Sequence, residues 1–514
     1  MILRSCFAQC VSTCMALYFM LASSTAVSNI RGETPAALPQ PPKQLTTQQI
    51  EQLTLDGDRF ADQGKYQQAV EKYTEAYMSV VADLRGKPFK EMVKPKLMNR
   101  EELAKEMTEQ FKLELTPAEL HLMEATFKVF GLAPESMNID KTMIQLYTEE
   151  VGGFYDPRTK AMVLIHDNPS EDAKAKQKGI FGWLSKPDSS FDKEEQKTTL
   201  AHELTHALQD QLFDLESQTK LVSEDDDMTL AYSSLVEGDA TLVMFVDMGR
   251  ADGSSDDLLQ MDPQVAEAMF GMLKMTLPMA SGSTYRTAPR IFRESLLFPY
   301  MNGMAFSIYL TRRDRFREID RAFASPPVST EQILHPEKYL FQPDQPVTIT
   351  IPKADSLLGD AWNHLGGNCM GEFQTAIMLG DVDVQRQAAA GWDGDRYEVY
   401  ESKQNDGTTN RAVVWASAWD SVADAEEFAA TYKRYVERKI RLLTESPKEN
   451  AESTIETPNP IRWKVSIQQD DKRVILVQGL DDEIAESVID SAKLFTTKEK
   501  TFPTKQTVES DKAK

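Results

Sequence analysis

The sequence feature that most constrains the fold is the segment His202–His206, which reads His-Glu-Leu-Thr-His. On a helix, four residues turn the chain through about 400°, so the two histidines face the same way, one turn apart. The surrounding residues are apolar, which predicts a buried helix: Leu200, Ala201, Leu204, Ala207 and Leu208. Buried imidazoles and a carboxylate need polar partners, and a metal ion supplies them. The alternative, a core helix with two incidental histidines, would leave these groups without partners.

Two neutral imidazoles at this spacing can hold Zn²⁺ while a carboxylate beside them reaches a metal-bound water. We therefore predict that His202 and His206 are zinc ligands and that Glu203 is the catalytic base. A catalytic zinc needs a third protein ligand and one open position. We expect this ligand to be Glu237, because the apolar segment Leu235–Ala240 around it indicates a buried helix. The alternative is that Glu237 is an ordinary helix carboxylate.

The segment His202–Ala207, followed by Asp210, resembles the active-site helix of thermolysin-type gluzincins. In that clan a downstream helix supplies a glutamate ligand, which maps to Glu237. The resemblance implies a zinc endopeptidase with a zincin-like core. The chain departs from the clan at Thr241, where an aspartate usually orients a zinc-binding histidine. Asp239 or Asp210 could take the place of that aspartate.

A wider pattern resembles a group of secreted bacterial proteins that carry the same His-Glu-x-x-His helix. It comprises three segments beside that helix: Gly153–Pro157, Glu237–Ala240 and Pro327–Tyr339. This resemblance implies a zincin domain followed by a C-terminal module of its own.

The predicted function is zinc-dependent hydrolysis of peptide bonds in proteins or peptides. Zinc lowers the pKa of its bound water to about 7 and polarises the substrate carbonyl. Glu203 then takes the proton and passes it to the leaving amine. Three residues are candidate donors to the developing oxyanion: His335, Tyr339 and Tyr155. A catalytic and a structural role are equally open for His335, whereas a structural role is favoured for the two tyrosines.

A second class of function stays open: a non-catalytic envelope scaffold or binding protein that keeps a zinc site or none. Its working parts would be a helical hairpin near the N-terminus and an additional C-terminal domain. The presence of Glu203 argues against this alternative, because a purely structural zinc needs no general base.

The length of 514 residues predicts two or three domains rather than one core. We expect an α+β protein with an N-terminal helical region, a zincin-like metallopeptidase core and a C-terminal α+β domain. The predicted boundaries are 1–26 for a signal peptide, 27–45 for a linker, 46–130 for the helical region, 131–345 for the zincin-like domain, 346–500 for the C-terminal domain and 501–514 for a disordered tail.

The helical region contains one pattern that resembles a tetratricopeptide unit. Its residues are Leu53, Gly57, Phe60, Gly64, Ala69, Tyr73 and Ala76. We find no second copy, and a single repeat cannot bury its own hydrophobic face. We therefore expect this hairpin to pack on the rest of the protein, and a protein partner bound through it is the less favoured alternative.

Several elements are expected around the motif. A β-hairpin is predicted over 151–165, an insertion loop over 169–197, and helices near 196–214 and 228–249. In the C-terminal domain we expect strands at 397–400, 413–419, 463–467 and 474–477 and helices at 424–443 and 482–494. The aromatic and charged cluster Trp392–Tyr397 is expected to anchor that domain, with sugar or peptide binding as the minority alternative.

The formal net charge is −23, which argues against nucleic acid and anionic membranes as partners. Arg4, the apolar run Val11–Leu21 and the small residues Ser24–Ala26 are typical of a signal peptide. The protein is therefore expected to be secreted, periplasmic or held in the cell envelope, and an uncleaved leader would associate it with a membrane. Because the other cysteines lie in the leader, the mature chain would keep only Cys369 and form no intrachain disulfide.

Overall fold

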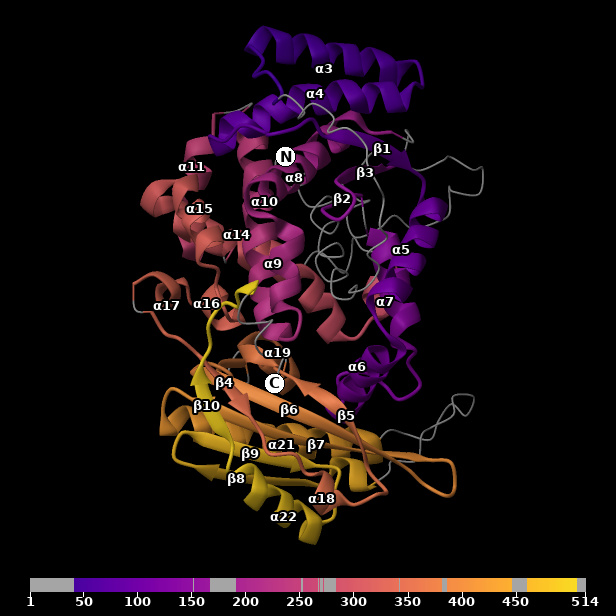
Figure 1. Cartoon of the computed structure of the whole chain (residues 1–514), viewed down its shortest axis with the longest axis vertical. Coiled ribbons are helices and arrows are strands. Elements are labelled where there is room, and N and C mark those ends of the chain that lie inside the picture. The colour runs from indigo at the N-terminus through magenta and orange to yellow at the C-terminus, as the bar shows by residue number, and fades with distance from the viewer. Residues whose placement is uncertain are drawn as a thin grey trace, which may run out of the picture.

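A computed structural model gives the fold, which is mixed α+β (Figure 1). The helical hairpin α3–α4 lies at one end of the molecule, and a five-stranded sheet lies at the other. The structure describes residues 41–150, 152–166, 191–250, 253–266, 268, 271, 283–341, 343–380, 386–445 and 460–505. The predicted signal peptide lies outside the described residues, as does most of the predicted loop 169–197. Within the described part, no helix is both long and apolar enough to span a membrane.

The N-terminal hairpin consists of α3 (Thr47–Asp62) and α4 (Tyr66–Arg85). The two helices touch at Gly57, where an added Cβ would lie 2.4 Å from the ring of Tyr73. This contact places a small residue where the pattern predicts one. Helix α4 also packs on α8, which carries the His-Glu-x-x-His segment. The hairpin is thus part of the main core, while its likeness to a tetratricopeptide unit stays a prediction.

A three-stranded sheet lies beside the hairpin. Strands β2 (Gly153–Asp156) and β3 (Ala161–Ile165) pair antiparallel, which confirms the predicted hairpin. The turn is held by Asp156, whose Oδ1 accepts hydrogen bonds from the backbone nitrogens of Arg158 and Thr159 at 2.9 and 3.3 Å. Strand β1 (Lys94–Met98) pairs parallel with β3. It was not expected in a region predicted to be helical, since its five residues include Pro95 and show no apolar alternation.

Long helices form the rest of the central body. The bounds are α5 Arg100–Glu114, α6 Pro117–Val129, α7 Ile139–Glu150, α8 Lys193–Phe213, α9 Leu215–Val222, α10 Asp226–Gly249, α11 Ser255–Leu259, α13 Ser283–Thr287, α14 Arg290–Asp314, α15 Phe316–Ala324, α16 Thr330–Leu334 and α17 Pro336–Leu340. The two helices predicted around the motif are confirmed as α8 and α10. Helix α8 begins inside the predicted insertion loop, because Asp192 caps it by accepting hydrogen bonds from Glu194 and Glu195.

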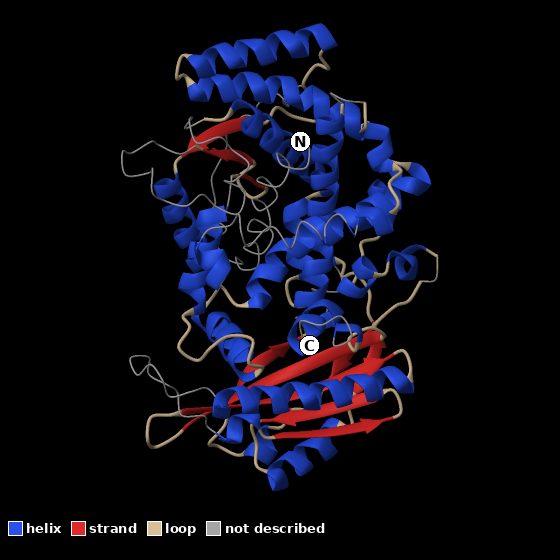
Figure 2. Ribbon diagram, turned by 180° about the vertical axis from the view of Figure 1, so that it is seen from behind, coloured by secondary structure: helices blue, strands red, loops and turns tan. Residues whose placement is uncertain are grey.

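The C-terminal part is built on an antiparallel sheet in the order β5-β6-β7-β9-β8. Its elements are β4 Val347–Thr350, α18 Asp355–Leu358, β5 Asn363–Asn368, α19 Gly371–Leu379, β6 Trp392–Lys403, β7 Thr409–Trp419, α21 Val422–Glu445, β8 Val465–Asp470, β9 Arg473–Gln478, α22 Asp482–Ala492 and β10 Thr496–Glu499. The four predicted strands and two predicted helices are confirmed, whereas β4, β5 and β10 were not predicted. Helix α21 covers one face of the sheet and α22 the other (Figure 2).

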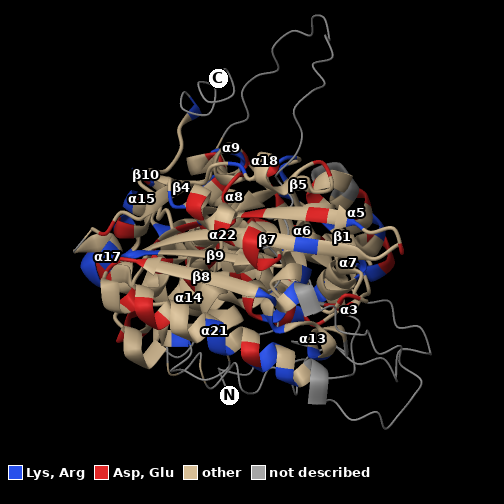
Figure 3. Ribbon diagram, turned by 90° about the horizontal axis from the view of Figure 1, so that it is seen from below, with Lys and Arg blue, Asp and Glu red and all other residues tan. Residues whose placement is uncertain are grey.

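The sheet is not isolated from the helical body. Phe130, at the end of α6, packs its ring edge-on against Tyr397 and Trp415 of the sheet. The end of the chain also returns to the helical body, where Phe502 packs against the core and Tyr232 of α10. Residues 506–514 of the predicted tail lie outside the described residues. Seen from below, basic and acidic residues are interspersed over the elements (Figure 3).

Asp395 explains how the cluster Trp392–Tyr397 anchors the sheet. Its buried carboxylate accepts hydrogen bonds from the indole nitrogens of Trp392 and Trp415 at 2.9 and 2.8 Å. The backbone nitrogens of Met370 and Gly371 add two more, each at 2.9 Å. The Sγ of Cys369 is a fifth donor at 3.2 Å, and the five together satisfy the charge without a basic side chain. They join the strand that holds Asp395 to a neighbouring strand and to the start of α19.

Replacing Asp395 with asparagine tests this anchor. The amide would point an N–H₂ group at donors, so we expect Asp395→Asn to lower the free energy of unfolding by about 3 kcal/mol. Asp393→Asn is the matched control, because burial and the nearby Asp420 raise the pKa of Asp393 to about 6. Its ionisation above pH 6 disfavours the folded state, so at pH 8 the control should be as stable as the wild type or more so. Urea unfolding of the three proteins at pH 8 measures both effects.

Candidate metal centre

Helices α8 and α10 bring three metal-ligating side chains together in the core. His202 Nε2 and His206 Nε2 lie 3.0 Å apart. Glu237 Oε2 lies 3.2 Å from the first nitrogen and 3.4 Å from the second. All three residues are fully buried. The predicted ligands His202, His206 and Glu237 thus form one triangle of donor atoms, drawn from two helices.

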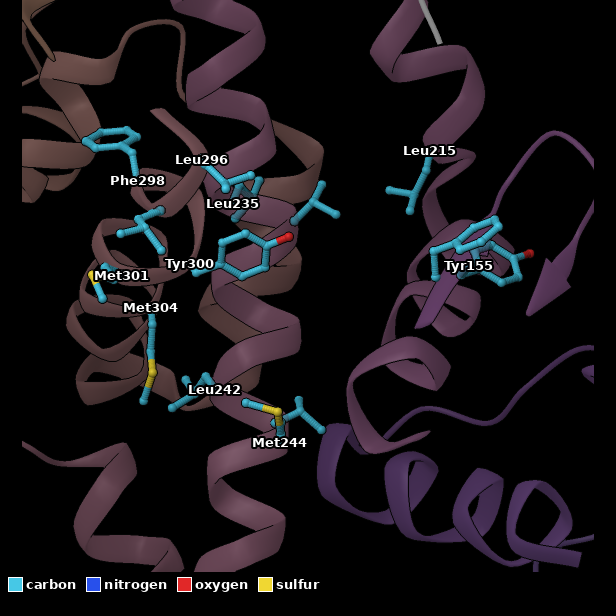
Figure 4. Packing of buried hydrophobic residues seen from close by; sticks show 14 of the residues in the cluster. Tyr155, Leu215, Leu235, Leu242, Met244, Leu296, Phe298, Tyr300, Met301 and Met304 are labelled. Carbon is cyan, nitrogen blue, oxygen red and sulfur yellow. The ribbon is translucent and has the colours of Figure 1, made fainter. Parts of the chain in front are cut away.

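The position of Glu237 depends on a close crossing between α10 and α14. A Cβ on Gly238 would lie 2.1 Å from the carbonyl oxygen of Gly303, and one on Gly303 would lie 2.1 Å from that of Ser234. The two backbones are therefore in direct contact one residue away from Glu237. Figure 4 shows the side chains that pack around this crossing: Leu235 and Leu242 from α10, and Leu296, Tyr300 and Met304 from α14.

The triangle fits a tetrahedral metal ion. Zinc bonds of about 2.0–2.1 Å place neighbouring ligand atoms roughly 3.3–3.4 Å apart, close to the observed spacings. Within the described residues, neither oxygen of Glu237 has a partner in ordinary hydrogen-bond geometry. Burying a carboxylate without such partners lowers the stability of the folded protein unless the carboxylate binds a cation.

Two other clusters of ligand-type residues differ from this one. Asp225, Asp227 and Cys369 surround Lys500, whose Nζ lies 2.9 Å from Asp225 and 3.2 Å from Asp227. In the second cluster the Nζ of Lys338 lies 2.6 to 3.0 Å from three carboxylates: Glu331, Asp344 and Asp420. In both clusters an ammonium group already occupies the space between the carboxylates and pairs with them. Within the described part of the chain, Glu237 has no such lysine or arginine partner.

The environment keeps Glu237 ionised. Burial alone would raise its pKa, but the two histidines outweigh burial and hold the pKa below its ordinary value. For His202, burial dominates and lowers the pKa, which favours the neutral ring. For His206, burial is outweighed by the charge of Glu237, so its pKa is raised. The triangle thus offers a negative charge and one neutral imidazole, and a metal would have to displace a proton from His206.

Gln209, one turn after His206, fixes the tautomer of that histidine. Its Nε2 donates one hydrogen bond to the carbonyl of Val236 at 3.0 Å and another to Asp239 at 2.9 Å. Both amide hydrogens are used, so Oε1 must be the atom that faces His206 Nδ1 at 2.9 Å. His206 therefore donates its Nδ1–H to Gln209. When a metal displaces the other proton of His206, the lone pair of Nε2 points toward the triangle.

The expected substitute for the missing aspartate is found in part. Asp239 reaches the centre through Gln209, and it is paired with Arg85 of α4 at 3.1 Å. Asp210 serves elsewhere: it accepts a hydrogen bond from the hydroxyl of Tyr155 at 2.8 Å and pairs with Lys160 at 2.5 Å. Of the two candidates, Asp239 therefore belongs to the surroundings of His206, while Asp210 ties α8 to the β2–β3 hairpin.

The predicted base, Glu203, follows His202 on α8 and is fully buried. Its charge is one of the causes that raise the pKa of His206. The predicted oxyanion donors have other partners. His335 Nε2 lies 2.9 Å from Glu372, which raises the pKa of the histidine, and the hydroxyl of Tyr339 donates to the carbonyl of Ser325 at 2.7 Å.

The structure thus brings His202, His206 and Glu237 together, with Glu203 next to His202 on α8, and it pairs His335 with Glu372 of α19 instead. A catalytic role for His335 stays a prediction. Tyr155 is engaged as well, through its hydrogen bond to Asp210. For the two tyrosines, these contacts agree with the structural role favoured from the sequence.

Tyr300 of α14 is a neighbour of the centre that sequence reasoning missed. Its ring stacks on His202 with the ring centroids 6.1 Å apart and the planes 30° from parallel. It is buried, and in Figure 4 its hydroxyl points toward the side on which Tyr155 lies. No local signal links Tyr300 to the motif, because the contact depends on how α14 crosses α10.

Comparison with known proteins concerns the sheet and not this centre. Residues 363–489 match the model of a domain of unknown function (DUF8575). The match begins with β5 and ends within α22, so it covers the five-stranded sheet. No curated protein and no solved structure matches the chain.

The glycine crossing gives a direct test of what places Glu237. Alanine normally stabilises a helix relative to glycine by roughly 1 kcal/mol. We expect Gly303→Ala to do the opposite and lower the free energy of unfolding by about 2–3 kcal/mol, because its Cβ would meet the backbone of Ser234. Gly152→Ala is the control, since its Cβ meets nothing within 4 Å. Urea unfolding measures the free energy of unfolding of both variants, and equal values would contradict the argument.

Proposed function

We propose that this chain is a zinc-dependent metallopeptidase of the gluzincin type, which hydrolyses peptide bonds of proteins or peptides outside the cytoplasm. One observation carries the proposal. Two imidazole nitrogens of α8 and one carboxylate oxygen of α10 converge within 3.4 Å of one another, and Glu203 follows His202 on α8. A set of two histidines and one glutamate is the ligand type of catalytic zinc, and it leaves one coordination position for substrate or water.

The proposed chemistry divides between the metal and the chain. Bound zinc supplies Lewis acidity, which lowers the pKa of water to about 7 and polarises the scissile carbonyl. Glu203 accepts a proton from the attacking water at its carboxylate and delivers it to the nitrogen of the leaving amine. Gln209 holds the Nδ1–H of His206, so that Nε2 keeps its lone pair for the metal. Complete burial of His202, Glu203, His206 and Glu237 strengthens each of these electrostatic interactions.

The extracytoplasmic location rests on the leader-like residues 1–26, and it is part of the proposal. The alternative is a non-catalytic envelope scaffold that keeps the zinc site. Glu203 weighs against it, because a structural zinc needs no general base.

The test compares zinc content and peptidase activity in four purified proteins. Wild type should hold about one zinc per chain and cleave casein or a quenched peptide library. Glu203→Gln should keep zinc and lose at least roughly 100-fold in kcat/KM, because it removes only the base. Glu237→Ala should lose zinc and activity together. Glu194→Gln, an exposed residue on the same helix, should match the wild type.

Each outcome separates the alternatives. Wild-type protein that holds zinc but cleaves no peptide would favour the scaffold. Wild-type protein without zinc would overturn the metallopeptidase proposal altogether. Equal activity in the wild type and Glu203→Gln would show that Glu203 is not the base, even if zinc is bound.

A further inference from the structure

A continuous path of buried polar groups leads from the metal centre to the N-terminal hairpin. It starts at His206 Nδ1, passes through the amide of Gln209 and reaches the carboxylate of Asp239. Arg85, the last residue of α4, continues the path: its Nε lies 3.1 Å from Asp239 Oδ1 and 3.2 Å from Oδ2. Arg85 Nη2 donates at 2.9 Å to Asp320 of α15. The path joins four helices through side chains far apart in the sequence.

Arg85 is held in one orientation. Its side chain is 1% exposed, that of Asp239 is 0% exposed, and the ring of Phe316 lies 4.8 Å from the guanidinium carbon. A planar guanidinium with two carboxylate partners and an aromatic ring has little freedom to turn. It therefore fixes the carboxylate of Asp239, which has no other basic partner among the described residues.

Fixing Asp239 matters because Gln209 depends on it. The amide of Gln209 has two orientations of similar shape, and only one presents Oε1 to His206. The carbonyl of Val236 and the acceptor oxygen of Asp239 together select that orientation, because each accepts one of the two Nε2 hydrogens. In the other orientation Nε2 would face His206, which would then carry its proton on Nε2 and could not offer that atom to a metal.

We propose that Arg85 is a positioning residue of the metal centre: it acts through Asp239 and Gln209 to set the tautomer of His206. The inference rests on the proposed function, since the atom positioned is the proposed zinc ligand. The N-terminal hairpin would then help to orient a zinc ligand, a role that the His-Glu-x-x-His motif does not indicate.

The rest of the N-terminal region is built into the core in the same way. Lys197 of α8 pairs with Asp58 of α3 at 3.0 Å, and β1 adds a parallel strand to β3. Residues 47–98 are therefore packed into the same folded body as the metal centre. Removal of this region would expose the buried charge of Asp239 and release Gln209.

The experiment uses full-length protein loaded with zinc or with Co²⁺, whose visible spectrum reports ligand geometry. Arg85→Gln and Gln209→Met are the test variants. Gln209→Met keeps the volume and leaves the pair between Arg85 and Asp239 intact, so it remains informative if Arg85→Gln fails to fold. Lys87→Gln is the matched control: Lys87 pairs with Asp320 at 3.0 Å but is 41% exposed and makes no contact with Asp239.

We expect both test variants to bind zinc about 10- to 100-fold more weakly in a chelator competition and to change the Co²⁺ spectrum. Lys87→Gln should leave both measurements unchanged. Arg85→Lys keeps the charge without the planar fork and should recover part of the affinity. Folded test variants with wild-type affinity and spectrum would overturn the inference, as would equal losses in Lys87→Gln. If the wild type binds neither metal, the proposed function itself fails, which this comparison shows separately.

Discussion

The carboxylate of Glu237 is the constraint around which the central body is organised. It is fully buried and ionised, and within the described residues its close neighbours are two imidazoles. A charge in such a place requires compensation, and it also requires that the helix carrying it cannot shift. Helix α10 meets the second requirement. It is buried along nearly its whole length and crosses α14 backbone to backbone at Gly238 and Gly303.

The C-terminal part of the chain holds the beginning of the same helix. Asp227, in the first turn of α10, accepts hydrogen bonds from the backbone and hydroxyl of Thr330 at 3.0 and 2.5 Å. Lys500, just after β10, pairs with Asp225 and Asp227. Asn368 at the end of β5 accepts a hydrogen bond from the backbone nitrogen of Asp226 at 3.0 Å, so the five-stranded sheet is also joined to this end of α10. Arg85 of the hairpin contacts the same helix beyond Glu237. Segments at both ends of the chain fix the position of the helix that supplies the third donor atom.

Local patterns predicted the parts of this centre that lie within one helix. Spacing alone placed His202 and His206 on one face, and apolar neighbours marked both α8 and α10 as buried. The capping residues and the β2–β3 hairpin are also local, because a turn or a helix start depends on a few consecutive residues. The structure placed Glu237 beside the histidines, as its apolar surroundings suggested. Most C-terminal strands were predicted for the same reason, since their apolar residues follow a regular period.

The missed elements depend on contacts between distant segments. Strand β1 forms because β3 offers it a parallel partner, and its own sequence does not alternate. Tyr300 reaches His202 only through the crossing of α14 and α10. No role was predicted for Gln209, because its role follows from contacts with Val236 and Asp239 on another helix, α10. Such contacts are fixed by tertiary packing, which no short window of sequence reports.

The use of an amide beside His206 also has an electrostatic reason. If zinc is bound as proposed, its two positive charges balance Glu203 and Glu237, and Arg85 balances Asp239. A carboxylate in place of Gln209 would add an unbalanced negative charge to a buried site. The neutral amide instead donates to Asp239 and accepts from His206, so it orients His206 without adding a charge. Asp239 thus orients His206 through Gln209, while Arg85, which balances the charge of Asp239, lies on a separate helix, α4.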